Sequence, residues 1–283
     1  MLEPVRKLLR PTNATPTTSS ALPRAEFGEM KHNVDAIRFN PPEGMPDFYP
    51  GPSIGAPELG RRFHEGTTEY VDFARELLGI LEPDSYTTYL QAFYANGVER
   101  FGKSWGYADI VTSLIGLADM LKPTSYLEIG VRRGRSACAV GWRAPNASMV
   151  FFDKWVKNYA GMDNPGPELV KAELAKVGHK APVEFINGNS HETLPRYFAA
   201  NPDASFDIIT VDGDHSDLGA AQDIVDVIPH LKIGGALVFD DIAHPTHPGL
   251  RGVWREVVEG DGRFSVYNYE SVGYGIGFAI RRF

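Results

Sequence analysis

After residue 123 the sequence alternates short apolar runs with segments of helical periodicity, and this alternation constrains the fold more than any other feature. The apolar runs are Tyr126–Ile129, Met149–Phe152, Val183–Ile186, Phe206–Val211 and Ala236–Phe239. Strands that alternate with helices form βαβ units, and hence a parallel sheet covered by helices. Two later runs, Phe264–Tyr269 and Ile276–Ile280, are joined by a short glycine-containing segment, which predicts an antiparallel hairpin. We therefore predict, over residues 123–283, a doubly wound α/β domain whose mostly parallel seven-stranded sheet ends in an antiparallel closing strand.

The residues before 123 fall into two segments of different composition. Residues 1–65 are rich in Thr, Ser, Pro and Gly, most clearly over Pro11–Ala21 and Pro41–Pro57. This composition predicts an extended or partly disordered N-terminal arm. Over residues 66–122 helical periodicity appears twice. The two apolar stripes are Val71, Ala74, Leu77, Leu78 and Leu81, then Ile110, Val111, Leu114, Ile115, Ala118 and Leu121. We expect this helical segment to cover the active site.

Composition limits the class of partner. The chain has 283 residues, of which 43% are hydrophobic, so it can bury a substantial core. Its net charge of -8, with no long basic run, argues against nucleic-acid binding and favours a small-molecule partner. Cys138 is the single cysteine, which excludes a disulfide framework within one chain and favours a reducing cytoplasm. No apolar run approaches the roughly 20 residues that span a bilayer, so we expect no membrane association.

A glycine loop follows the first predicted strand of the α/β domain. The sequence runs from Glu128 and Gly130 through Gly134 to Ser136, where a helix begins. Gly130 would allow a tight turn against a ligand, Gly134 would bring the helix close to the sheet, and the helix N-terminus and Ser136 would bind an anionic group.

An acidic residue, Asp153, ends the second strand, where a carboxylate can accept both hydroxyls of a ribose. Together with the loop it predicts an adenosine-containing cofactor. The spacing of the loop glycines, Gly-x-x-x-Gly, disfavours NAD and FAD. The alternative is an ordinary turn between strand and helix.

Carboxylates and imidazoles follow the fourth and fifth strands. Asp212, Asp214 and His215 leave the fourth strand, and Asp240, Asp241, His244 and His247 follow the fifth. Carboxylates at adjacent strand ends repel one another unless a cation lies between them, and oxygen ligands suit Mg²⁺ or Ca²⁺. Asp212, Asp240 and Asp241 are therefore the predicted metal ligands. The alternative is that Asp214 and Asp241 face solvent while Asp212 caps the next helix.

The sequence Leu127-Glu128-Ile129-Gly130, followed by Gly134 and Ser136, resembles the first motif of class I methyltransferases, and the resemblance extends over residues 123–283. It implies that the glycine loop holds the amino-acid end of S-adenosylmethionine and that Asp153 holds the ribose. It also implies that polar side chains after the third strand contact the adenine edge, although Ser190 could cap a helix instead. The implied cofactor-binding residues are Glu128, Gly130, Gly134, Ser136, Asp153, Asn189, Ser190 and Asp212.

Within this class the acidic residues resemble those of metal-dependent O-methyltransferases, both the catechol type and the type that modifies macrolide sugars. The resemblance implies that Asp212, Asp240 and Asp241 bind the metal, most simply Mg²⁺. His215 stands where the catechol enzymes have a lysine. It is the predicted general base, because an imidazole titrates near neutral pH; a histidine that only orients a carboxylate is the alternative. His244 and His247 are expected at the pocket rim or in solvent rather than on the metal.

The resemblance implies an O-methyltransferase that acts on a hydroxyl of a small molecule such as a sugar, phenol or natural product. The alternatives are a metal-independent methyltransferase acting on nitrogen, carbon or a carboxylate, an iron or zinc enzyme of another kind, and a scaffold that binds without turnover. The aromatic residues of the N-terminal segment could cover the substrate, pack as a helical collar, or mediate association into a homo-oligomer. They are Tyr86, Tyr89, Phe93, Tyr94, Phe101, Trp105 and Tyr107.

Overall fold

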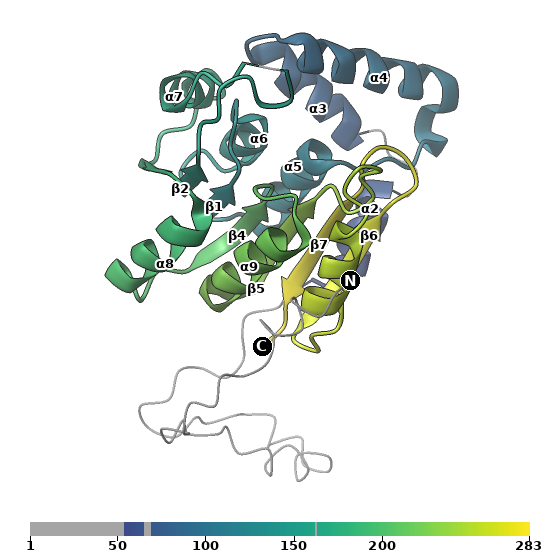
Figure 1. The fold of residues 1–283 in the computed structure, drawn as a ribbon. Coiled ribbons are helices and arrows are strands. Elements are labelled where there is room, and N and C mark those ends of the chain that lie inside the picture. The colour runs from purple at the N-terminus through teal and green to yellow at the C-terminus, as the bar shows by residue number, and fades with distance from the viewer. Residues whose placement is uncertain (1–53, 65–68, 162) are drawn as a thin grey trace, which may run out of the picture.

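The computed structural model describes residues 54–64, 69–161 and 163–283. A seven-stranded sheet lies at the centre of this part of the chain (Figure 1). Its strands are β1 (Ser125–Ile129), β2 (Ser148–Asp153), β3 (Val183–Asn187), β4 (Phe206–Val211), β5 (Leu231–Asp240), β6 (Phe264–Tyr269) and β7 (Ile276–Arg281). They lie in the order β3-β2-β1-β4-β5-β7-β6, and β7 is antiparallel to both of its neighbours. The predicted sheet, including its antiparallel closing strand, is confirmed.

Helices cover both faces of the sheet, as a doubly wound fold requires (Figure 1). The α-helices are α2 (Ala56–His64), α3 (Glu69–Ile80), α4 (Ser85–Phe101), α5 (Ile110–Leu121), α6 (Arg135–Arg143), α7 (Pro167–Lys176), α8 (Ser190–Ala200), α9 (Asp217–Val227) and α10 (Leu250–Trp254). One core joins a face of the sheet to α2 through α7, and a second joins the opposite face to α8, α9 and α10. Neighbouring strand residues enter different cores, Tyr126 the first and Leu127 the second, because side chains alternate along a strand.

The two helices predicted between residues 66 and 122 correspond to α3 and α5, and a third helix, α4, lies between them. Aspartates fix the start of α4 and of α5. Asp84 accepts a hydrogen bond from the Thr87 amide at 2.6 Å, and Asp109 forms a reciprocal capping box with Thr112. These caps satisfy amides that a helix start leaves without partners. Gly102, at φ +54°, then ends α4.

Helix α2 lies within the segment for which the composition predicts an extended arm. Its nine residues instead bury Leu59 and Phe63, one turn apart, against the sheet. The Phe63 ring lies 5.1 Å from that of Tyr70 and 5.7 Å from that of Phe278, between ring centroids. The local Pro and Gly content obscured this short amphipathic pattern. Residues 1–53 of the predicted arm lie outside the described residues.

None of the helices in the described ranges is long and apolar enough to cross a membrane.

The packing of α2 is testable by truncation. Phe63 is 1% exposed, so Phe63→Ala should lower the free energy of unfolding by about 3–5 kcal/mol through lost burial and a residual cavity. Phe101→Ala, at a site that is 51% exposed, should change it by less than about 1 kcal/mol. Urea denaturation of both variants measures the difference, and equal stability would contradict the docking of α2 on the sheet.

Candidate active site

A cleft of about 1100 Å³ lies at the carboxyl ends of the parallel strands. Open α/β sheets bind their ligands at this edge. One side of the cleft is formed by residues of the glycine loop and by Asp153. Another is formed by Asp212, His215, Asp240 and Asp241, and a third by aromatic side chains near and on α4. These aromatic residues are Tyr86, Tyr89, Phe93 and Tyr107.

Gly130 brings the loop against the end of β4. Its φ of +86° favours glycine, and a Cβ there would lie 1.8 Å from the main-chain oxygen of Asp212. Its amide donates to the Phe152 carbonyl at 2.9 Å. Any other residue would separate the loop from Asp212, so this contact joins the two halves of the site.

Gly134 also has a left-handed backbone, with a φ of +73°. A Cβ there would lie 2.8 Å from a methyl carbon of Val170, which belongs to α7. The sequence argument expected Gly134 to bring the helix close to the sheet. The structure instead assigns the close approach to α7.

Asp153 is held by two backbone amides. Its Oδ2 accepts from the amide of Arg132 at 2.8 Å, and its Oδ1 accepts from the amide of Trp155 at 2.5 Å. Each carboxylate oxygen can accept further bonds, so both remain able to receive hydroxyls. The side chain is thus oriented in the cleft before any ligand binds.

Glu128 lies beneath the loop and is fully buried. It accepts hydrogen bonds from the Tyr126 hydroxyl at 3.1 Å and from the Ser136 hydroxyl. Burial raises the pKa of this carboxyl well above its ordinary value. The residues that line the cleft include Gly130, Ser136, Asp153, Ser190 and Asp212 of the predicted cofactor set, but not Glu128, Gly134 or Asn189.

Ser190 follows the helix cap instead of forming it. The N-cap residue of α8 is Asn189, and the Ser190 hydroxyl hydrogen-bonds the buried Asp223 carboxylate. The capping alternative for Ser190 therefore does not hold.

Asp212, His215 and Asp241 converge at the ends of β4 and β5. The imidazole Nε2 lies 3.6 Å from Oδ1 of Asp212 and 3.5 Å from Oδ2 of Asp241, and the three potential ligand atoms lie within 4.8 Å of one another. Among the described residues this Nε2 has no hydrogen-bond partner although it is buried. On the other side of the ring, Nδ1 lies 3.2 Å from the Tyr159 hydroxyl.

The carboxylates of Asp212, Asp240 and Asp241 lie close enough to repel one another. Burial, and then the charge of Asp212, raises the pKa of Asp241 to about 7. Burial and the neighbouring Asp241 raise the pKa of Asp240 well above its ordinary range. The contact with Asp212 raises the pKa of His215, although burial opposes this. The group therefore favours bound protons or a bound cation.

The alternative of solvent-facing or capping aspartates does not describe this group. The side chain of Asp241 is only 14% exposed, and α9 is capped by Ser216 rather than by Asp212. Asp240 lines the cleft but does not belong to the converging trio. The rings of His244 and His247 lie 6.5 Å and 5.0 Å from that of His215, between ring centroids, and both residues line the cleft.

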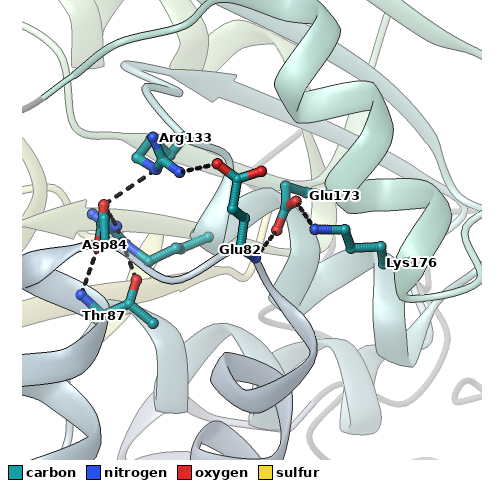
Figure 2. Close-up of polar contacts among 7 residues, drawn as sticks. Glu82, Asp84, Thr87, Arg133, Glu173 and Lys176 are labelled. Carbon is teal, nitrogen blue, oxygen red and sulfur yellow. Dashed lines mark hydrogen bonds and ion pairs between the residues drawn. The ribbon is translucent and has the colours of Figure 1, made fainter.

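Sequence reasoning missed an ionic network that joins the glycine loop to the turn before α4 (Figure 2). Arg133 pairs with Glu82 and Asp84, and Arg135 pairs with Asp84. Burial alone would raise the pKa of Asp84, but hydrogen bonds from Thr87 and the charges of both arginines hold it below its ordinary value. The only signal in the sequence was the presence of three arginines, Arg132, Arg133 and Arg135, within the loop.

The comparisons agree with this site. The family described as "Methyltransferase domain" matches residues 127–242. Residues 127–242 therefore match a methyltransferase domain, which supports the resemblance to class I, S-adenosylmethionine-dependent methyltransferases. The match covers the glycine loop, Asp153 and the acidic residues after β4 and β5, so it includes two of the three sides of the cleft but not the aromatic side. No curated protein sequence matches the chain.

Solved structures share the fold at low sequence identity. A putative O-methyltransferase from Klebsiella pneumoniae is 15% identical, with a TM-score of 0.50, over 76% of this chain and 90% of that one. CalS11, a TDP-rhamnose 3'-O-methyltransferase of calicheamicin biosynthesis, is 21% identical, with a TM-score of 0.48, over 76% and 93%. TomG from Streptomyces achromogenes, an O-methyltransferase of tomaymycin synthesis, is 20% identical, with a TM-score of 0.47, over 76% and 90%.

The role of the glycine loop in cofactor binding can be tested with two matched alanine variants. Gly130 and Gly178 both have positive φ, +86° and +80°, so Ala strains both backbones by about 1–3 kcal/mol. A Cβ at Gly130 also collides with Asp212, whereas nothing lies within 4 Å of one at Gly178. Calorimetric titration should show that Gly130→Ala weakens S-adenosylmethionine binding at least about tenfold while Gly178→Ala binds as the wild type does. Equal binding would remove Gly130 from the cofactor site.

Proposed function

We propose that the chain is an O-methyltransferase that transfers the methyl group of S-adenosylmethionine to a hydroxyl of a small molecule, assisted by a divalent cation. The observation that carries this proposal is the convergence of Asp212, His215 and Asp241 beside the glycine loop. Methyl transfer to oxygen needs an acceptor that loses its proton, and this group offers both a cation site and an imidazole.

The cofactor side of the proposal rests on groups that are already oriented. Gly130, Ser136, Asp153, Ser190 and Asp212 line the cleft and would contact the cofactor. Glu128 would act on the cofactor indirectly through Ser136, Gly134 through its packing against α7, and Asn189 through the start of α8. Holding the sulfonium methyl and the acceptor oxygen in line would supply much of the rate enhancement.

The residues present fit a divalent cation. Asp212 and Asp241 each offer a carboxylate oxygen, and these two atoms lie within 4.8 Å of each other, so both can reach one ion while Nε2 of His215 stays available for a proton. Asp212 and Asp241 supply hard oxygen donors suited to Mg²⁺, and Asp240 is an additional candidate ligand from the resemblance. When bound, the cation would increase the acidity of the acceptor hydroxyl.

His215 is the proposed proton acceptor. Nδ1 is held by the Tyr159 hydroxyl, which leaves Nε2 on the side of the carboxylates. Asp212 and Asp241 raise the pKa of this imidazole and would stabilise the imidazolium that proton transfer forms. His244 and His247 stand at the rim, where they could contact the acceptor.

The aromatic wall supports an acceptor with a flat or apolar face. Successive rings of Tyr86, Tyr89 and Phe93 have centroids 6.3 Å and 6.2 Å apart and lie within 25° of parallel. A phenol, the apolar face of a sugar or a natural product can pack against such a row. We therefore propose a small hydroxylated molecule of this kind as the acceptor.

Asp153 tests the cofactor half. Asp153→Ala removes the acceptor of the Arg132 and Trp155 amides and the proposed ribose contacts, and should weaken S-adenosylmethionine binding at least about tenfold. Asp153→Asn keeps one carboxamide oxygen and should therefore lose less affinity for S-adenosylmethionine. Calorimetric titration of the three proteins measures the order, and binding by the Ala variant at wild-type affinity would contradict the assignment.

Asp241 tests the metal half separately. Asp241→Asn removes a charged ligand but lies outside the proposed cofactor contacts, so it should bind S-adenosylmethionine normally and lose methyl transfer by about 100-fold. Turnover is measured on a panel of catechols and glycosides with Mg²⁺ and then with a chelator. Wild-type activity that survives chelation would instead support a metal-independent methyltransferase.

A further inference from the structure

The turn between α3 and α4 is bound to the glycine loop by three ion pairs (Figure 2). Oδ2 of Asp84 lies 3.1 Å from Nε of Arg133 and 3.0 Å from Nη1 of Arg135. Nη2 of Arg133 lies 3.3 Å from Oε1 of Glu82. The side chains of Arg133, Arg135 and Asp84 are only 9%, 13% and 16% exposed. Such pairs are screened far less than surface pairs, and loss of one partner leaves a buried charge without compensation.

The same aspartate fixes the beginning of α4. Oδ1 of Asp84 accepts from the Thr87 amide, while Oδ2 receives both arginines. The Arg135 guanidinium also lies over the Tyr86 ring, 4.8 Å from its centroid. Tyr86, Tyr89 and Phe93 extend from this point along the proposed acceptor wall. Loop and wall therefore meet at one carboxylate.

Helix α7 supports the turn from behind. Glu173 is 2% exposed, accepts from the Glu82 amide at 2.7 Å and pairs with Lys176 at 2.5 Å. Gly134 of the loop packs against Val170 of the same helix. The loop, the turn and α7 thus contact one another in a closed circuit, which limits independent movement of any one of them.

We propose that Asp84 is a positioning residue, which through Arg133 and Arg135 transmits cofactor binding at the glycine loop to the acceptor wall on α4. A ligand that orders the loop orders its arginines, and these order the turn and the first two turns of α4. Cofactor binding then already includes the loss of conformational entropy that ordering the aromatic row requires. The acceptor therefore binds the cofactor-bound protein more tightly, which is positive coupling. This inference rests on cofactor binding at the glycine loop, and Asp84 itself contacts no reacting atom.

Asp84→Asn tests the transmission because Asn is as good an N-cap as Asp but carries no charge for the arginines. The probe is S-adenosylhomocysteine, and the readout is hydrogen exchange of peptides covering residues 85–93 and 130–136 with and without it. Wild type should be protected by the ligand in both peptides. Asp84→Asn should keep protection in the loop and lose it in α4.

Two further variants bracket this result. Glu82→Gln removes only the half-exposed partner of Arg133, so it should fold as the wild type does and lose part of the α4 protection. Glu168→Gln removes the exposed Lys171 pair on α7 and should behave as wild type. A general loss of stability would raise exchange with and without ligand alike, whereas loss of transmission changes only the ligand-dependent difference.

Turnover gives the second readout. With an acceptor from the methyl-transfer panel, Asp84→Asn should raise the acceptor KM about tenfold, a modest coupling, while the S-adenosylhomocysteine Kd changes less than about threefold. Protection of α4 that is unchanged in Asp84→Asn and Glu82→Gln, or absent in wild type, would overturn the proposal while leaving cofactor binding intact. Failure of the wild type to bind the probe would overturn the proposed function as well.

Discussion

The contact between Gly130 and the main-chain oxygen of Asp212 is the constraint on which the rest of the site depends. Strands β1 and β4 are parallel neighbours, with Ile129 opposite Val211, so the residues that follow them leave the sheet together. Only a glycine lets the first chain turn across the second at this distance. The loop for the cofactor and the first carboxylate of the acidic group are therefore set by one backbone approach. Neighbouring side chains can differ without moving the glycine loop away from the acidic group, because the contact is made by backbone atoms.

The site extends from that contact in two directions, and different interactions hold the residues in each direction. Toward β2, Asp153 is oriented by backbone amides, which belong to the fold and need no further side chain. Toward α4, the loop depends on charged side chains, and their partners lie about 50 residues earlier in the sequence. The proposed cofactor half thus belongs to the sheet, whereas the proposed acceptor wall is joined to the loop by ion pairs. A family of enzymes that keeps one donor and varies the acceptor would gain from this division.

How far the sequence predicted the structure follows from the range of each interaction. Strands β1 to β5, the closing hairpin and helices α3 and α5 have strong local periodicity, so they were predicted within a few residues, apart from the start of β5. Helices α2 and α4 were not predicted: Pro and Gly precede α2, and the apolar face of α4 is interrupted by aromatic and polar residues. The pairing of Asp84 with Arg133 and Arg135 could not be predicted, because these residues are about 50 positions apart and nothing in the sequence distinguishes Asp84 from other aspartates. The strand-end rule correctly brought Asp212, His215 and Asp241 together, but it could not separate Asp240 from Asp241.

The separation of those two aspartates follows from backbone geometry. Consecutive residues at a strand end point in different directions, and Asp241 adopts a left-handed φ of +62° that turns it toward Asp212. Asp240 is half-buried nearby. Burial raises the pKa of Tyr86, and the charge of Asp240 adds to this rise. Two carboxyls with raised pKa beside an unbonded imidazole nitrogen destabilise the fold unless something neutralises them. Such an arrangement persists where binding or catalysis compensates its cost, which is why the site argues for chemistry as well as for fold.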